Sequence, residues 1–92
     1  MFSILYFMSR VIIDVRSPAE YSGGHVEGAF NVPLNVLPSV VGQLDKRANI
    51  VVYCASGSRS AMAEKILKGY GFSNVVNGKT RKDTEKLIKN GR

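Results

Sequence analysis

The feature that most constrains this chain is the stretch from Asn49 to Tyr70. It opens with Ile50-Val51-Val52-Tyr53, a short apolar and β-branched run that predicts a buried strand. After a loop of small residues, apolar side chains recur about once per helical turn, which predicts a helix with one apolar face. That face is expected to consist of Met62, Ile66, Leu67 and Tyr70. The single cysteine of the chain, Cys54, stands where the strand ends.

The loop after this strand, Cys54-Ala55-Ser56-Gly57-Ser58-Arg59, has the composition of an anion cradle. Small residues that lead into a helix leave several backbone N–H groups facing one concavity, and Gly57 supplies the conformational freedom such a curl needs. A thiol beside these groups has its thiolate stabilised, and the Arg59 guanidinium suits oxyanions. A lone cysteine is usually a small buried hydrophobic residue. The combination here favours a nucleophile.

Composition indicates one small domain without a cofactor. A chain of 92 residues forms one modest core. Because the chain has one cysteine, it cannot form an intramolecular disulfide. Because it also has only one histidine, it offers too few of the usual ligands for zinc or an iron–sulfur cluster. We therefore expect no metal and no organic cofactor.

The charge is concentrated in the C-terminal third. Residues 1–58 carry four basic and four acidic groups, whereas residues 59–92 carry nine basic and three acidic groups, so the net charge of +6 arises there. A nucleic-acid interface would combine such charge with aromatic platforms or a recognition motif, and neither is present. Solvated helix faces account for this charge most simply, and steering of anionic substrates comes second.

Elsewhere the pattern predicts alternating strands and helices. The near-continuous apolar run Val11–Val15 predicts a central parallel strand covered on both faces. Ser17, with proline next and Glu20 three residues on, predicts a capping box and a short helix. The remaining predictions are a very short strand at Val26, a helix over 36–44, a strand at Asn74-Val75-Val76, a turn at Asn77-Gly78, and a last helix capped by Thr80.

Residues 1–10 are predicted to form an apolar arm or edge strand, and residues 11–92 the domain. The N-terminal apolar stretch is too short to span a membrane, and no signal-peptide pattern accompanies it. We expect a cytoplasmic monomer, or a periplasmic protein if the N-terminus is a truncated export signal.

Three motifs in order resemble the rhodanese family. Ile13-Asp14-Val15-Arg16 with the helix start after it resembles the family's first-strand signature. The segment from Gly24 to Pro33, GHVEGAFNVP, resembles its GH-x-x-GA-x-N-x-P segment, and Cys54–Arg59 resembles its six-residue active-site loop. The likeness covers residues 11–78 and is strongest to small single-domain sulfurtransferases of the phage-shock type. Two features depart from the family pattern: the family usually has a second glycine where Lys79 stands, and an aromatic residue in the helix after it.

The resemblance implies a single α/β domain with a central, mainly parallel sheet flanked by helices on both faces. It implies sulfur transfer through a Cys54 persulfide, from thiosulfate or a similar anionic donor to cyanide or a thiol, including a protein cysteine. Ala55 to Arg59 would bind the donor. For Asp14 and Arg16 it implies a structural role near the site, in keeping with the need of buried charges for partners. The only histidine, His25, would lie in a structural segment.

Two alternatives remain open. A phosphatase or arsenate reductase of related fold also uses a loop cysteine and arginine, but with five residues between them. Here four residues separate Cys54 from Arg59, and the residue with five between it and Cys54 is Ser60. A non-catalytic rhodanese-like binding or regulatory module is the other alternative, although such modules often lack the cysteine that this chain retains.

Overall fold

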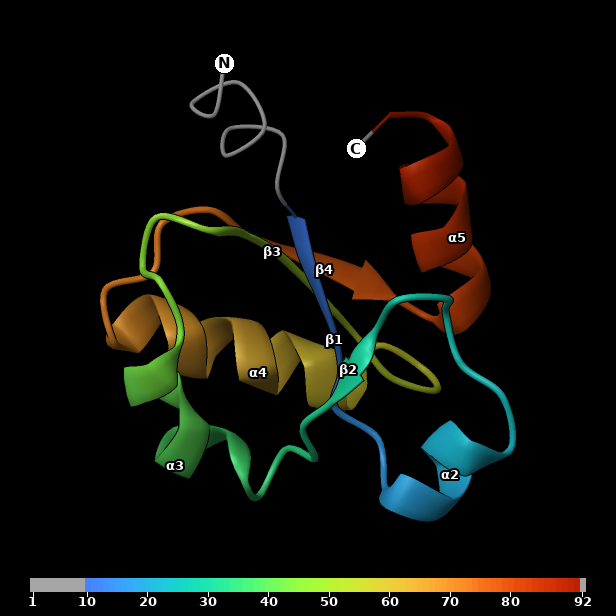
Figure 1. Ribbon diagram of the computed structural model, residues 1–92, viewed down its shortest axis with the longest axis horizontal. Helices are drawn as coiled ribbons and strands as arrows, with labels where there is room; N and C mark the ends of the chain where they lie inside the picture. Colours follow the sequence, from blue (N-terminus) through green and yellow to red (C-terminus); the bar gives the residue numbers. More distant parts are fainter. Residues whose placement is uncertain (1–9, 92) are drawn as a thin grey trace.

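Four parallel strands form the centre of the computed structural model, which describes residues 10–91. The strands are β1 (Arg10–Asp14), β2 (Phe30–Asn31), β3 (Asn49–Tyr53) and β4 (Val75–Lys79), and their order across the sheet is β2-β1-β3-β4 (Figure 1). Their carboxyl ends therefore share one edge, where Cys54 follows β3.

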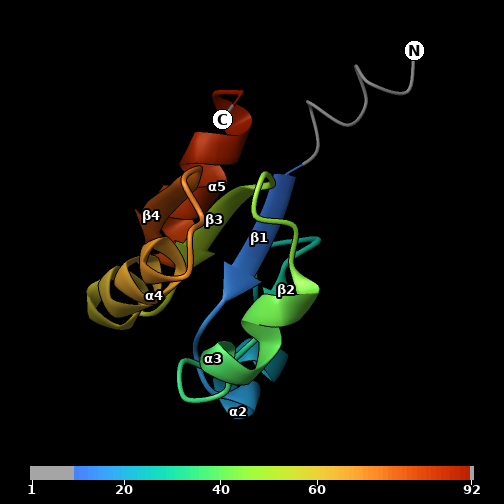
Figure 2. The same cartoon turned by 90° about the vertical axis from the view of Figure 1, so that its left-hand side faces the viewer.

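Helices cover both faces of this sheet, as the sequence predicts. One face packs against α3 (Leu37–Val40), the 3₁₀ turn η1 (Val41–Gln43) and α4 (Ser58–Gly69), in a core that includes Ile13, Val52 and Leu67. The other face is covered by α5 (Arg81–Lys89) through Ile88 and by the segment around Val26. Both views show α5 and α2 (Pro18–Ser22) toward opposite ends of the domain (Figure 2). The single α/β architecture is confirmed.

The helix starts follow local chemistry closely. The Ser17 hydroxyl accepts a hydrogen bond from the Glu20 backbone N–H, and the Glu20 carboxylate accepts one from the Ser17 N–H, so the predicted capping box is present. Thr80 likewise caps α5 by accepting from the Asp83 N–H at 3.0 Å. Such caps satisfy N–H groups that a helix leaves without partners in its first turn.

Apart from the bounds of β1, four details differ from the sequence prediction. Val26 is buried but not in a strand, because the strand that pairs with β1 is Phe30–Asn31. The helix predicted over 36–44 is a four-residue helix that tightens into a 3₁₀ turn. On α4 the buried residues are Ser60, Ala63 and Leu67, whereas Met62 and Tyr70 are about half exposed. The small Ser60 and Ala63 let α4 lie close to the sheet.

The fourth difference is that Asn77 and Gly78 belong to β4 rather than to a turn. Val52 pairs with Asn77 and Tyr53 with Lys79, so Gly78 is an extra residue that forms a bulge. A Cβ on Gly78 would clash with the Thr84 Oγ1 and would lie 2.9 Å from the Val51 Cγ1. The glycine thus allows α5 to approach the sheet closely, and the last helix is docked.

β1 begins at Arg10, one residue earlier than predicted, and lies inside the sheet. The predicted arm or edge strand otherwise falls on residues 1–9, outside the described residues. Within residues 10–91, no helix has the length and apolar character needed to cross a membrane.

Candidate active site

Cys54 lies at the carboxyl end of β3, below the first turn of α4. Its side chain is part of the core beneath α4, and the residue is 1% exposed. Its backbone N–H donates to the Lys79 carbonyl at 2.8 Å, which fixes the residue to the neighbouring strand. The thiol is therefore held by the sheet, while the loop that follows curls over it.

Backbone and side-chain donors converge on the Cys54 sulfur. The Gly57 N–H donates to Sγ at 3.0 Å and the Ser60 N–H at 3.4 Å, while the Ser60 hydroxyl lies 3.5 Å away. Gly57 has a φ of 103°, a left-handed conformation that turns its N–H toward the sulfur and opens α4. The predicted cradle of N–H groups is therefore observed at Gly57 and extends one residue beyond the predicted loop, to Ser60.

These contacts favour the thiolate. Burial alone would raise the pKa of Cys54, but hydrogen bonds from the Ser60 hydroxyl and from the backbone N–H groups of Ser60, Gly57 and Ser56 outweigh it. The pKa of Cys54 consequently lies below that of an ordinary thiol. Ser60 was missed as a site residue by the sequence reasoning. Its position next to Arg59, in the first turn of α4, is the signal that could have found it.

The rest of the predicted loop is more exposed. Ala55, Ser56 and Ser58 are exposed, and the Ser56 and Ser58 hydroxyls lie 3.2 Å apart. These three residues form the exposed rim of the loop that begins at the buried Cys54.

Arg59 does not stand free at the site. Its two terminal nitrogens bind the two carboxylate oxygens of Glu20 at 2.8 and 3.0 Å. Together with the Ser17 N–H, Arg59 lowers the pKa of Glu20 to about 2. This bidentate pair joins the loop to α2, and no local sequence pattern indicates it because the two residues are 39 positions apart.

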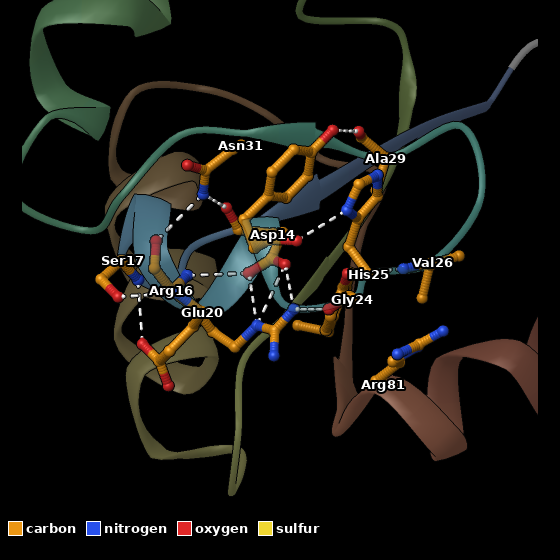
Figure 3. Close-up of polar contacts among 12 residues, drawn as sticks. Asp14, Arg16, Ser17, Glu20, Gly24, His25, Val26, Ala29, Asn31 and Arg81 are labelled. Atoms are coloured by element: carbon orange, nitrogen blue, oxygen red, sulfur yellow. Dashed lines mark hydrogen bonds and ion pairs between the residues drawn. The ribbon is translucent and has the colours of Figure 1, made fainter.

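Asp14 and Arg16 form a second ion pair, at the end of β1 (Figure 3). The Asp14 carboxylate is fully buried and accepts from the Arg16 backbone N–H, Nε and Nη2 at 2.7–3.0 Å. Arg16 Nη2 also donates to the Gly24 carbonyl at 2.7 Å, and Asn31 Nδ2 donates to the carbonyls of both Asp14 and Arg16. The pair thereby ties β1 to the segments that follow α2.

His25 is held within the same region. Its ring stacks on Tyr21 with the ring centres 3.6 Å apart, and its Nδ1 lies 2.8 Å from the Tyr21 carbonyl. A carbonyl only accepts, so Nδ1 carries the proton of this bond. The ring is therefore engaged with α2, and the hydrogen bond observed for it does not involve Cys54. Among residues 10–91, no group of three or more His, Cys, Asp and Glu side chains is arranged to hold a metal ion.

Comparison with known proteins identifies what this fold and site resemble. The family model described as a rhodanese-like domain matches residues 6–79. The chain is 36% identical, over 90% of its length and 82% of the relative's, to the thiosulfate sulfurtransferase PspE of Escherichia coli. It is 33% identical to a sulfurtransferase of Allochromatium vinosum, covering 73% of this chain and 63% of that protein. Among solved structures, a rhodanese with anions from E. coli superposes with a TM-score of 0.77 at 36% identity, covering 82% of this chain and 91% of that one.

Proposed function

This chain belongs to the rhodanese-like family and is a sulfurtransferase, and we propose that it moves a sulfane sulfur from thiosulfate or a similar anionic donor to a thiol acceptor through a persulfide on Cys54. The observation that carries the proposal is the convergence of donors on the Cys54 sulfur, which lowers its pKa at the opening of α4.

In the first half-reaction the Cys54 thiolate attacks the outer sulfur of thiosulfate. A bond forms between the two sulfurs, the bond to the sulfonate sulfur breaks, and sulfite leaves with its electron pair. The enzyme then carries a persulfide anion. The N–H groups of Gly57 and Ser60 already point at Sγ, so they are in place to stabilise negative charge on the sulfur chain.

In the second half-reaction an acceptor attacks the outer persulfide sulfur, and Cys54 leaves as a thiolate. Cyanide would give thiocyanate, and a small thiol or a protein cysteine would become a persulfide. The low pKa of Cys54 serves this step too, because a more acidic thiol is a better leaving group. Neither half-reaction calls for a metal or organic cofactor.

The burial of the sulfur supports a small reacting group. Since Cys54 is 1% exposed, only a narrow end group can reach Sγ past the rim, and a terminal sulfur atom is such a group. A related phosphatase would carry an arginine with five residues between it and the cysteine. In this chain Ser60 occupies that position, and it is buried with its hydroxyl 3.5 Å from the sulfur.

The test is intact mass after incubation with thiosulfate, on the wild-type protein and on Cys54→Ser. We expect a gain of one sulfur atom on the wild type alone, reversed by cyanide or a thiol. A Ser39→Ala variant, which alters an exposed hydroxyl on α3, serves as a matched control and should gain the same mass. A gain on Cys54→Ser would refute the role of Cys54. No gain on any variant would favour the non-catalytic binding module.

A further inference from the structure

Most of the positive charge beside Cys54 is neutralised within the fold. Arg59 shares both of its terminal nitrogens with Glu20, and Arg16 is paired with the buried Asp14. Each pair has a net charge of zero and a fixed geometry. Anionic donors therefore gain little net attraction from either arginine. A cation without an acidic partner would attract them more strongly.

Lys79 lies directly against the loop. Its carbonyl accepts the Cys54 N–H at 2.8 Å, and a Cβ placed on Gly57 would lie 3.4 Å from the Lys79 Cβ and 3.6 Å from its Cγ. The Lys79 stem thus runs alongside the residue that donates to the sulfur. Lys79 is exposed, and no carboxylate within the described part of the chain forms an ion pair with its ammonium group.

The backbone at Lys79 is held in an unfavourable conformation. Its φ of 72° makes it the one non-glycine residue with positive φ among residues 10–91. The Asn77 side chain holds this geometry by accepting the Lys79 N–H at 2.9 Å, while the Asn77 Nδ2 lies 3.5 Å from the Gly57 carbonyl. A β-carbon in this region is disfavoured, and such strain is concentrated at functional positions in proteins. Glycine would relieve it, yet the chain places a long cation here.

We propose that Lys79 is a donor-binding residue that contacts the anionic end of the sulfur donor, the sulfonate of thiosulfate, while Cys54 attacks the outer sulfur. The inference rests on the sulfurtransferase reaction proposed above and specifies how that site selects its substrate. The Lys79 ammonium group attracts the thiosulfate dianion to the exposed rim of the loop. It also stabilises the negative charge that develops on the departing sulfite. Donors with greater negative charge at the leaving end are accordingly preferred.

The experiment measures persulfide loading alone, by rapid quenching and intact mass, as a function of donor concentration. Two donors are compared: thiosulfate, a dianion that releases sulfite, and methanethiosulfonate, a monoanion that releases methanesulfinate. In Lys79→Asn the half-saturating thiosulfate concentration should rise about two- to fivefold, the size expected for losing one exposed ion contact. The rise should be smaller for methanethiosulfonate, and the maximal rate should change little.

Asparagine tolerates the left-handed conformation, so this variant keeps the backbone. Lys79→Arg retains the charge and should restore the wild-type concentration dependence. Lys89→Asn removes the same charge from the far end of α5 and should behave as wild type. Equal effects at positions 79 and 89, or an unchanged half-saturating concentration in Lys79→Asn, would overturn the role of Lys79 while persulfide formation stands. A wild-type protein that accepts sulfur from neither donor would overturn both proposals.

Discussion

Removing the Ser60 hydroxyl should raise the pKa of Cys54. In Ser60→Ala the backbone N–H groups that reach the sulfur stay in place, and only the hydroxyl 3.5 Å from Sγ is lost. The hydroxyl has one proton, which can point to Sγ or to the Gly57 carbonyl at 3.1 Å. The Asn77 amide lies 3.5 Å from the same carbonyl, so the carbonyl keeps a donor when Ser60 turns toward the thiolate.

The size of the effect follows from the geometry. A hydrogen bond to a charged group contributes roughly 1.5–3 kcal/mol, and this sulfur–oxygen contact is a long one, so we take the lower end. The pKa of Cys54 should therefore rise, and since about 1.4 kcal/mol is a factor of ten in an equilibrium constant, the thiol–thiolate equilibrium should shift about tenfold toward the thiol. At a pH below both values, the thiolate fraction falls about tenfold. The greater nucleophilicity of the more basic thiolate offsets part of this, leaving alkylation about threefold slower.

The pKa can be measured from the rate of iodoacetamide alkylation across a pH series, and independently from the ultraviolet absorbance of the thiolate. Because Cys54 is the only cysteine, both signals report on one group. Ser39→Ala is the control and should leave the pKa unchanged. A Ser60→Ala pKa equal to that of the wild type would refute the reasoning, as would a wild-type pKa at or above that of a free thiol.

Three further predictions concern stability. The folded-state pKa of Glu20 is lowered to about 2, so its ion pair with Arg59 stabilises the protein above the unfolded pKa near 4.5 and is lost as the pH falls through about 2. The stability difference between wild type and Glu20→Gln, from urea unfolding, should therefore shrink over that window, and a pH-independent difference would contradict this. Within the described residues the buried Thr84 hydroxyl has no hydrogen-bond partner, so Thr84→Val should stabilise the fold by about 1 kcal/mol, whereas Thr84→Ser, which keeps the hydroxyl, should not. Lys79→Gly should relieve the positive φ at this position and raise the free energy of unfolding by up to about 1 kcal/mol, measured as a higher urea midpoint. A lowered midpoint would argue against strain at this position.

Local sequence signals determined the parts of the fold that depend on neighbours in the chain. The capping box at Ser17 and Glu20 involves residues three apart, so its composition alone identified the start of α2. The apolar run before Cys54 and the small residues after it similarly predicted β3, the loop and α4. The alternation of strands and helices along the chain was sufficient to predict the α/β architecture.

The apolar pattern of α4 was only partly right, because Leu67 is buried and Ile66 packs against the core, whereas Met62 and Tyr70 are about half exposed. The first two turns of α4 include Ser60, which contacts Cys54, and Ala63; both small residues are buried while Met62 is half exposed. Near Cys54, side-chain volume rather than hydrophobicity therefore selected the buried residues of α4, while Leu67 is buried farther along the helix. That requirement comes from the sheet and cannot be read from the helix itself.

The sequence by itself therefore determined the strand, loop and helix that hold Cys54, the proposed nucleophile, because these depend on contacts within a few residues. Only the tertiary structure decided which charges the site has available. Glu20 reaches Arg59 across 39 positions and neutralises it, whereas the bulge at Gly78 brings Lys79 beside the loop without an acidic partner among the described residues. Pairing between distant side chains depends on how the strands and helices pack, and no local pattern encodes it.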